Sequence, residues 1–303
     1  TGLTYTAGQK KLVNRLLNDP TNSSIFYAAT TDGVHKSTDD GVTWNLISSE
    51  VFIDMEFKPG ASNIIYGSSK MGGIYKSTNS GNSWNNTLST SGRRTEMAVS
   101  SNNANVVYAL MAAASSGLYG IYKSTNSGSS FTEIYNSPNL LGWSCNGGGS
   151  GGQGWYDLCI AADPNDVNTV FIGGVNTWKS TDGGNSWDIN NHWSSTCGGN
   201  ATNVHADKHN LVFQNSSSTL FECNDGGLYK TTNSGNTWEH LTNGMVISQM
   251  YKLGVAQTTP DDVITGLQDN GTKALITLIW EDVIGGDGME CLIDWSDENI
   301  QYG

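Results

Sequence analysis

The sequence predicts an all-β protein, a seven-bladed β-propeller with four-stranded antiparallel blades, of which about six and a half blades are present. An eight-residue motif recurs five times and always ends in an aromatic residue: Ser37–Trp44, Ser77–Trp84, Ser124–Phe131, Ser180–Trp187 and Thr231–Trp238. The glycines of successive copies lie 40, 47, 56 and 51 residues apart. A period of roughly 40–50 residues built from short strands is typical of propeller blades.

Each repeat contains four strand signals in the same order. The first two are apolar segments rich in β-branched and aromatic residues, and a turn with Asp, Pro or Asn separates them. A glycine-containing loop, a third strand, the motif as a hairpin turn and a fourth strand complete the unit. The clearest second strands are at positions 25–28, 64–67, 106–109 and 170–173. Four antiparallel strands per repeat predict one blade.

The C-terminal repeats are less regular. Segments 251–255 and 263–266 read as two strands of a sixth blade, and Trp280 stands where the motif places its aromatic residue. A seventh blade begins at 288–294 and reaches 300–302. Residues 1–6 are expected to form the outer strand of a preceding blade. We therefore expect residues 1–303 to form a single domain that is a piece of a longer chain.

The residues of the motif are expected to have a structural role. Its glycine supplies a backbone position with positive φ, and the Asp or Asn two residues earlier can accept hydrogen bonds from the turn. Asp39 and Asp182 are replaced by Asn in the other three copies. The position therefore needs an oxygen and not a charge, which argues against a catalytic or metal-binding role. The aromatic residue is expected to pack one blade on the next.

These repeats resemble the Asp-box, the repeat of bacterial neuraminidases. The repeats contain the sequences Asp-Pro-x-Asn, Tyr-Ala-x-Thr and Lys-Ser-Thr-Asp-x-Gly-x-x-Trp. In these sequences they are most similar to xyloglucanase-type enzymes of glycoside hydrolase family 74 and to related secreted bacterial propellers. They also resemble sortilin-type propellers. The resemblance implies an essential Asp directly after Tyr-Ala-x-Thr. Here Thr31 holds that place, and Asp32 follows one position later.

The charge balance excludes several partners. The chain has 15 Lys and Arg against 28 Asp and Glu, and its net charge is −13. Nucleic acid and anionic lipid both require a basic face. The apolar stretch 274–280 is much shorter than the roughly 20 residues that span a bilayer, so no membrane insertion is expected. Only three arginines are present, Arg15, Arg93 and Arg94, which disfavours the arginine cluster that would bind the sialic acid carboxylate.

Five cysteines are present. Cys159 and Cys291 occupy corresponding apolar segments and are expected to be reduced core residues. Cys145 and Cys197 lie in the two longest glycine- and serine-rich insertions, and they are the pair we expect to form a disulfide. An odd count without Cys-x-x-Cys spacing argues against zinc. No cofactor and no metal are predicted.

The insertions, about 137–157 and 190–205, and the loops between second and third strands are expected on one face of the propeller. This loop-rich face carries four aromatic residues that could stack on sugar rings or simply pack the loops: Trp143, Trp155, Tyr156 and Trp193. It also carries four acids that could form a glycosidase pair or belong to turns: Asp32, Asp225, Asp269 and Asp287.

His205, Asp207 and His209 have the alternate spacing that would place three ligands on one face of a strand. Alignment within the chain instead places Asp207 in the turn that ends a first strand, like Asp19 and Asp163. We therefore favour a structural role.

Two functions remain open. The favoured one is a secreted or surface-displayed module that binds polysaccharide or a protein across the loop-rich face. The alternative is a glycoside hydrolase of xyloglucanase type acting on β-glucan, whose cleft would need a second propeller.

Overall fold

The computed structural model describes residues 3, 12–194, 197, 201–245, 250–257, 259, 262–276 and 279–303. These form two compact units. The first comprises Thr1–Asn224 and Leu228–His240, and the second comprises Asp225–Gly227 and Leu241–Gly303. Apart from one 3-10 turn, η1 (Ser101–Asn103), the described residues contain strands and loops only. The expected strand over residues 1–6 lies outside the described residues, except for Leu3.

The first unit contains five sheets. The first two consist of β1 (Val13–Asn18), β2 (Phe26–Thr30), β3 (Gly33–Ser37) and β4 (Asn45–Ser48), then β5 (Asp54–Lys58), β6 (Ala61–Ser68), β7 (Gly73–Ser77) and β8 (Asn85–Ser89). The third consists of β9 (Thr95–Val99), β10 (Val107–Ala112), β11 (Leu118–Ser124) and β12 (Thr132–Tyr135). The fourth and fifth consist of β13 (Cys159–Ala162), β14 (Val170–Gly173), β15 (Thr177–Ser180), β16 (Asp188–His192) and β17 (Thr202–Asn203), then β18 (Lys208–Phe213), β19 (Leu220–Asn224), β20 (Gly227–Thr231) and β21 (Glu239–His240).

The second unit contains one four-stranded sheet and one two-stranded sheet. The former has β22 (Met250–Val255), β23 (Val263–Leu267), β24 (Gly271–Ile276) and β25 (Ile279–Ile284), and the latter has β26 (Leu292–Ile293) and β27 (Gln301–Tyr302). The irregular sixth repeat and the half repeat after it are therefore confirmed.

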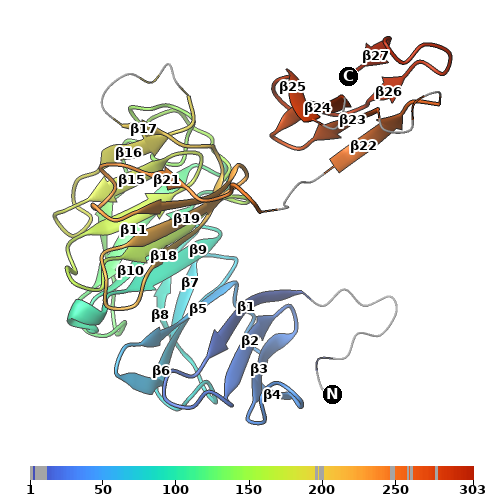
Figure 1. Ribbon diagram of the computed structural model, residues 1–303. Coiled ribbons are helices and arrows are strands. Elements are labelled where there is room, and N and C mark those ends of the chain that lie inside the picture. The colour runs from blue at the N-terminus through green and yellow to red at the C-terminus, as the bar shows by residue number, and fades with distance from the viewer. Residues whose placement is uncertain are drawn as a thin grey trace. The chain divides into compact units, whose positions relative to one another are not determined.

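Each complete sheet follows the chain order from its first to its last strand, and its first four strands are antiparallel. In the first unit the first strand of each sheet contacts the first strand of the next, which brings β1, β5, β9, β13 and β18 side by side (Figure 1). First strands that meet around an axis are the defining feature of propeller blades. The first unit therefore has the architecture of a β-propeller with five blades, and the second unit contains a sixth four-stranded sheet and a two-stranded part of a seventh.

Aromatic residues fill the space between adjacent blades. The same position of the second strand holds Tyr27, Tyr66, Tyr108 and Phe171, each at most 1% exposed. Tyr27 meets Phe57 of the next sheet with ring centroids 5.7 Å apart. Such edge-to-face contacts add to the hydrophobic stabilisation of the core.

The repeated motif forms the turn that the sequence predicts. Its Asp or Asn accepts the backbone N–H four residues later, at 2.8 Å from Thr43 to Asp39 and 2.9 Å from Ser83 to Asn79. Asp and Asn therefore accept the same backbone hydrogen bond, as expected for a position that needs a side-chain oxygen and not a charge. The motif aromatic also packs across blades, since Trp187 contacts Tyr135 of the preceding sheet with ring centroids 6.5 Å apart.

Gly128 combines two requirements for glycine, because its φ is +69° and it lies against Tyr66 of the neighbouring blade. A Cβ atom there would stand 2.5 Å from Tyr66 Cε1. We expect Gly128→Ala to lower the free energy of unfolding by about 2–4 kcal/mol, the sum of a left-handed backbone cost and overpacking. Gly60→Ala is the control, since Gly60 has φ +76° and no atom within 4 Å, and it should lose only about 1 kcal/mol. Urea denaturation measures both, and equal losses would contradict the packing argument.

The fourth sheet differs from the expected blade. β17, inside the 190–205 insertion, pairs in parallel with the outer strand β16 and makes a fifth strand. The pairing forms because the long insertion returns along the edge of its own blade. The repeat pattern of the sequence does not encode this return.

Candidate functional site

The first strands of the first unit enclose a cavity of about 1090 Å³. Its wall includes residues of β1, β5, β9, β13 and β18, together with segment 112–116, Gly154 and Trp155. A cavity of this size suits a drug-sized or oligomeric ligand.

The charged residues of the wall form a compact group. Arg15 of β1 pairs with two carboxylates of β5, because its Nε lies 3.2 Å from Asp54 Oδ1 and its guanidinium also binds Glu56. The second oxygen of Asp54 accepts the backbone N–H of Met97 at 2.8 Å. Arg94 lies 2.9 Å from Glu96 of β9. Three carboxylates thus share two guanidinium groups.

This imbalance affects proton binding. Burial, and next the carboxylate of Asp54, raises the pKa of Glu56 to about 7 and that of Glu96 to about 8. Burial also raises the pKa of Asp54, although Arg15 opposes it. The wall therefore holds carboxyl groups that can exchange protons near neutral pH.

Arg94 also organises the end of the first insertion. Its Nη1 donates to the carbonyl of Trp155 at 3.3 Å and to that of Tyr156 at 2.8 Å, and its Nη2 donates to that of Leu158 at 3.3 Å. The ring of Tyr156 lies 5.5 Å from that of Trp155 and packs edge-on against His209 at 4.8 Å. These hydrogen bonds fix the backbone at Trp155, and 70% of the surface of this residue stays exposed.

The two insertions are joined. Cys145 and Cys197, the pair predicted from sequence, form a disulfide with Cα atoms 5.6 Å apart. Trp193 Nε1 donates to the carbonyl of Trp143 at 3.3 Å, and both indoles are about half exposed. Trp143, Trp155 and Trp193 therefore present ring surface to solvent, whereas Tyr156 is half-buried.

Among the predicted acids, Asp32 belongs to its own turn. Its Oδ1 accepts from Thr30 Oγ1 at 2.5 Å and lies 3.2 Å from His35 Nε2. These contacts bind the carboxylate into the β2–β3 turn, which is the structural alternative for this residue.

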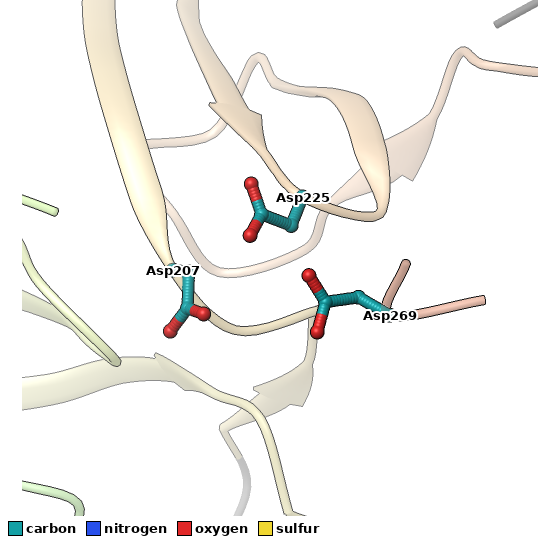
Figure 2. Close-up of side chains that lie close together, drawn as sticks. All are labelled: Asp207, Asp225 and Asp269. Carbon is teal, nitrogen blue, oxygen red and sulfur yellow. The ribbon is translucent and has the colours of Figure 1, made fainter. Parts of the chain in front are cut away.

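The other three acids belong to the second unit. Asp225 and Asp269 each follow the second strand of a sheet, and Figure 2 labels them together with Asp207, which belongs to the first unit. The backbone N–H of Asp269 donates to Asp287 Oδ1 at 2.8 Å. Burial, followed by Asp225 and then Asp287, raises the pKa of Asp269 to about 6.

His205, Asp207 and His209 do not share a strand face, because β18 begins only at Lys208 and Asp207 has a φ of 63° in the preceding turn. Lys208 itself is fully buried, and its ammonium group lies 3.3 Å from Glu222 Oε1. Glu222 also accepts from Thr177 at 2.6 Å and from Asn191 at 2.8 Å.

Sequence reasoning missed the charged cavity wall and the Lys208–Glu222 pair. Arg15, Asp54 and Glu96 stand at one position of successive first strands, opposite Ala29, Ser68 and Leu110 of the second strands. A search of the aligned repeats for charged residues inside apolar first strands could have found them.

No family model matches the sequence, and no curated protein does so either. Solved structures are similar in fold. An ancestral enzyme of glycoside hydrolase family 74 matches with a TM-score of 0.58 and 20% identity, over 89% of this chain and 38% of that one. The family 74 enzyme of Niastella koreensis matches with 0.57 and 18%, over 90% and 45%. The extracellular domain of a one-component system from B. thetaiotaomicron matches with 0.53 and 12%, over 94% and 35%.

At these identities the likeness shows the fold alone, a β-propeller. The chain spans less than half the length of each of these proteins. Among the described residues, no helix is long and apolar enough to cross a membrane.

Proposed function

We propose that this chain is a carbohydrate-binding propeller of a larger secreted or surface-displayed protein. The observation that carries the proposal is Trp155, which lines the cavity and is 70% exposed while Arg94 binds the backbone carbonyls of Trp155 and Tyr156. A rigidly mounted, exposed indole is suited to stack on the apolar face of a sugar ring. Trp143 and Trp193 present further exposed ring surface on the linked insertions.

Three further observations support this proposal. The disulfide between Cys145 and Cys197 is typical of an oxidising, extracellular compartment. Arginine, glutamate and histidine beside Trp155 offer the donors and acceptors that sugar hydroxyls need. The net charge of −13 favours a neutral polysaccharide over an acidic one, because like charges repel.

Affinity electrophoresis and calorimetry of the full chain against xyloglucan and other neutral β-glucans test this proposal. We expect binding that Trp155→Ala weakens about tenfold or more, equivalent to at least about 1.4 kcal/mol. Trp295→Ala is the matched control, since Trp295 is 77% exposed in the second unit, and it should bind like the parent. Absence of binding to every glycan, or equal behaviour of the two variants, would refute it.

A second candidate is hydrolysis of β-glucan, which the family 74 neighbours and one feature of the wall favour. Glu96 faces the cavity, and its pKa of about 8 keeps it protonated near neutral pH, as a general acid must be. Release of reducing ends from β-glucan that Glu96→Gln abolishes would support this candidate. Binding without any release of reducing ends would leave the module as a binder.

A further inference from the structure

Lys208 and Asn224 stand directly opposite each other on neighbouring strands of the fifth sheet. They are Cα partners in the antiparallel pair of β18 and β19, and the Cβ atoms of such partners lie about 4.5–5.5 Å apart. Glu222 comes two residues before Asn224 on β19, so its side chain lies on the same face of the sheet. An amine, a carboxyl group and a carboxamide therefore share one small region of the blade.

One carboxylate oxygen joins the three side chains. Glu222 Oε1 lies 3.3 Å from Lys208 Nζ and accepts from Asn224 Nδ2 at 3.0 Å. The two nitrogen atoms thus contact the same oxygen. The other oxygen, Oε2, accepts from Thr177 at 2.6 Å and from Asn191 at 2.8 Å. These two hydrogen bonds fix the orientation of the carboxyl group.

This region is closed to water. Lys208 and Glu222 are fully buried, and Asn224 is also buried. Burial removes the hydration of both charges of the ion pair, and transfer of one proton from the ammonium group to the carboxylate removes both charges together. The neutral amine keeps two N–H groups, for which the carbonyls of Val204 and His205 are acceptors. Its lone pair takes the place of the transferred proton, beside Glu222 and Asn224.

We propose that Lys208 and Asn224 react to form an intramolecular isopeptide bond, with Glu222 as the proton-transfer group. Lys208 Nζ attacks Asn224 Cγ, a new C–N bond forms, and the C–N bond to Nδ2 breaks. Nζ gives up two protons through Glu222 to Nδ2, which leaves as an ammonium ion. No oxidant or other reactant is needed. The reaction is favoured because nucleophile, electrophile and proton carrier are already held together by the fold.

The bond ties the first strand of this blade to the second and closes a covalent ring over residues 208–224. Such a cross-link stabilises a protein chiefly by restricting its unfolded chain. The ion pair of Lys208 and Glu222 is the state that precedes the bond, so the bond is detected through the covalent structure and not through the stability of the pair. The reaction does not involve Trp155, and it stands or fails separately from carbohydrate binding.

Mass spectrometry of the full chain, folded first and then reduced at its disulfide, tests the proposal. We expect the intact mass to be lower than that of the sequence by one ammonia. Trypsin cleaves after an unmodified Lys208 and yields the peptides 180–208 and 209–230. A cross-linked lysine resists trypsin, so the parent should give one peptide, 180–230, that lacks one ammonia. Fragmentation of this peptide should locate the link between residues 208 and 224.

Variants assign the reacting groups. Asn224→Ala removes the electrophile but keeps the Lys208–Glu222 pair, so it should have the full mass of its sequence and be cleaved after Lys208. Glu222→Gln, which cannot carry the protons, should behave in the same way. Asn185→Ala is the matched control, because Asn185 is an exposed asparagine of the same tryptic region, and it should retain the cross-link.

The parent alone can overturn the proposal, whether or not the variants fold. A folded parent with the full mass of its sequence and normal cleavage after Lys208 would do so. Loss of ammonia with normal cleavage after Lys208 would also contradict it, since that combination identifies a succinimide formed between an asparagine and the next backbone N–H. A cross-link that persists in Asn224→Ala would show that another carboxamide reacts.

Discussion

Glu222→Gln is expected to lower the free energy of unfolding of the first unit by about 3–5 kcal/mol. Both side chains of the Lys208–Glu222 pair are fully buried, and their charged atoms lie 3.3 Å apart. Glu222 also accepts from Thr177, Asn191 and Asn224. The amide keeps the shape of the side chain but removes the charge, so the ammonium group of Lys208 stays buried without its counter-ion.

The same sheet provides a matched control. Lys230 and Glu239 form an ion pair of 2.8 Å in which the Glu239 side chain is 62% exposed. Glu239→Gln should cost less than about 1 kcal/mol, because exposed pairs are screened by water and salt. Urea denaturation followed by tryptophan fluorescence compares the two variants.

Removing both charges provides a further check. Lys208→Met combined with Glu222→Leu should recover much of the lost stability, since apolar replacement of a buried ion pair is often neutral. A loss below about 1 kcal/mol for Glu222→Gln would mean that water reaches Lys208 and that the pair is not buried in solution.

The fold could be predicted because its signals are local. Each motif copy encodes its own turn: in the fourth copy, Ser180 Oγ accepts the N–H of Gly184 at 2.9 Å, and Asp182 accepts that of Ser186 at 2.9 Å. Such contacts span four residues and can be read from the spacing alone. Counting these turns gives five blades, and the strand signals of the irregular C-terminal repeats add the sixth and part of the seventh.

The cavity and the buried acids could not be predicted because they depend on contacts between blades. Arg15 and Asp54 are far apart in the chain and meet only when β1 and β5 lie side by side. In the sequence, Asp157 is simply the last residue of the 137–157 insertion. Its burial depends on how that insertion folds back on the propeller. The fifth strand β17 has the same origin, since a long insertion can pair wherever an open edge is available.

Stability of the first unit is expected to fall by about 3 kcal/mol or more as the pH rises from 5 to 9. The pKa values of Glu56, Glu96 and Asp157 are raised to about 7, 8 and 8, chiefly by burial. Between pH 4 and pH 8 the native state holds protons that the unfolded chain has released, so stability decreases with rising pH. Each pKa unit is worth about 1.4 kcal/mol, and the raised pKa values already include the opposing effects of Arg15 and Arg94.

Free energies of unfolding at pH 5, 6, 7, 8 and 9 measure this profile, and variants assign it. Glu96→Gln should flatten the decrease, because the amide keeps the neutral form that the fold prefers at low pH. Glu239→Gln, which changes an exposed acid, should leave the slope unchanged. Stability that rises with pH across this range would show that the arginines hold all three carboxyl groups ionised. The cavity wall would then be a permanently charged surface, without the proton exchange that its burial implies.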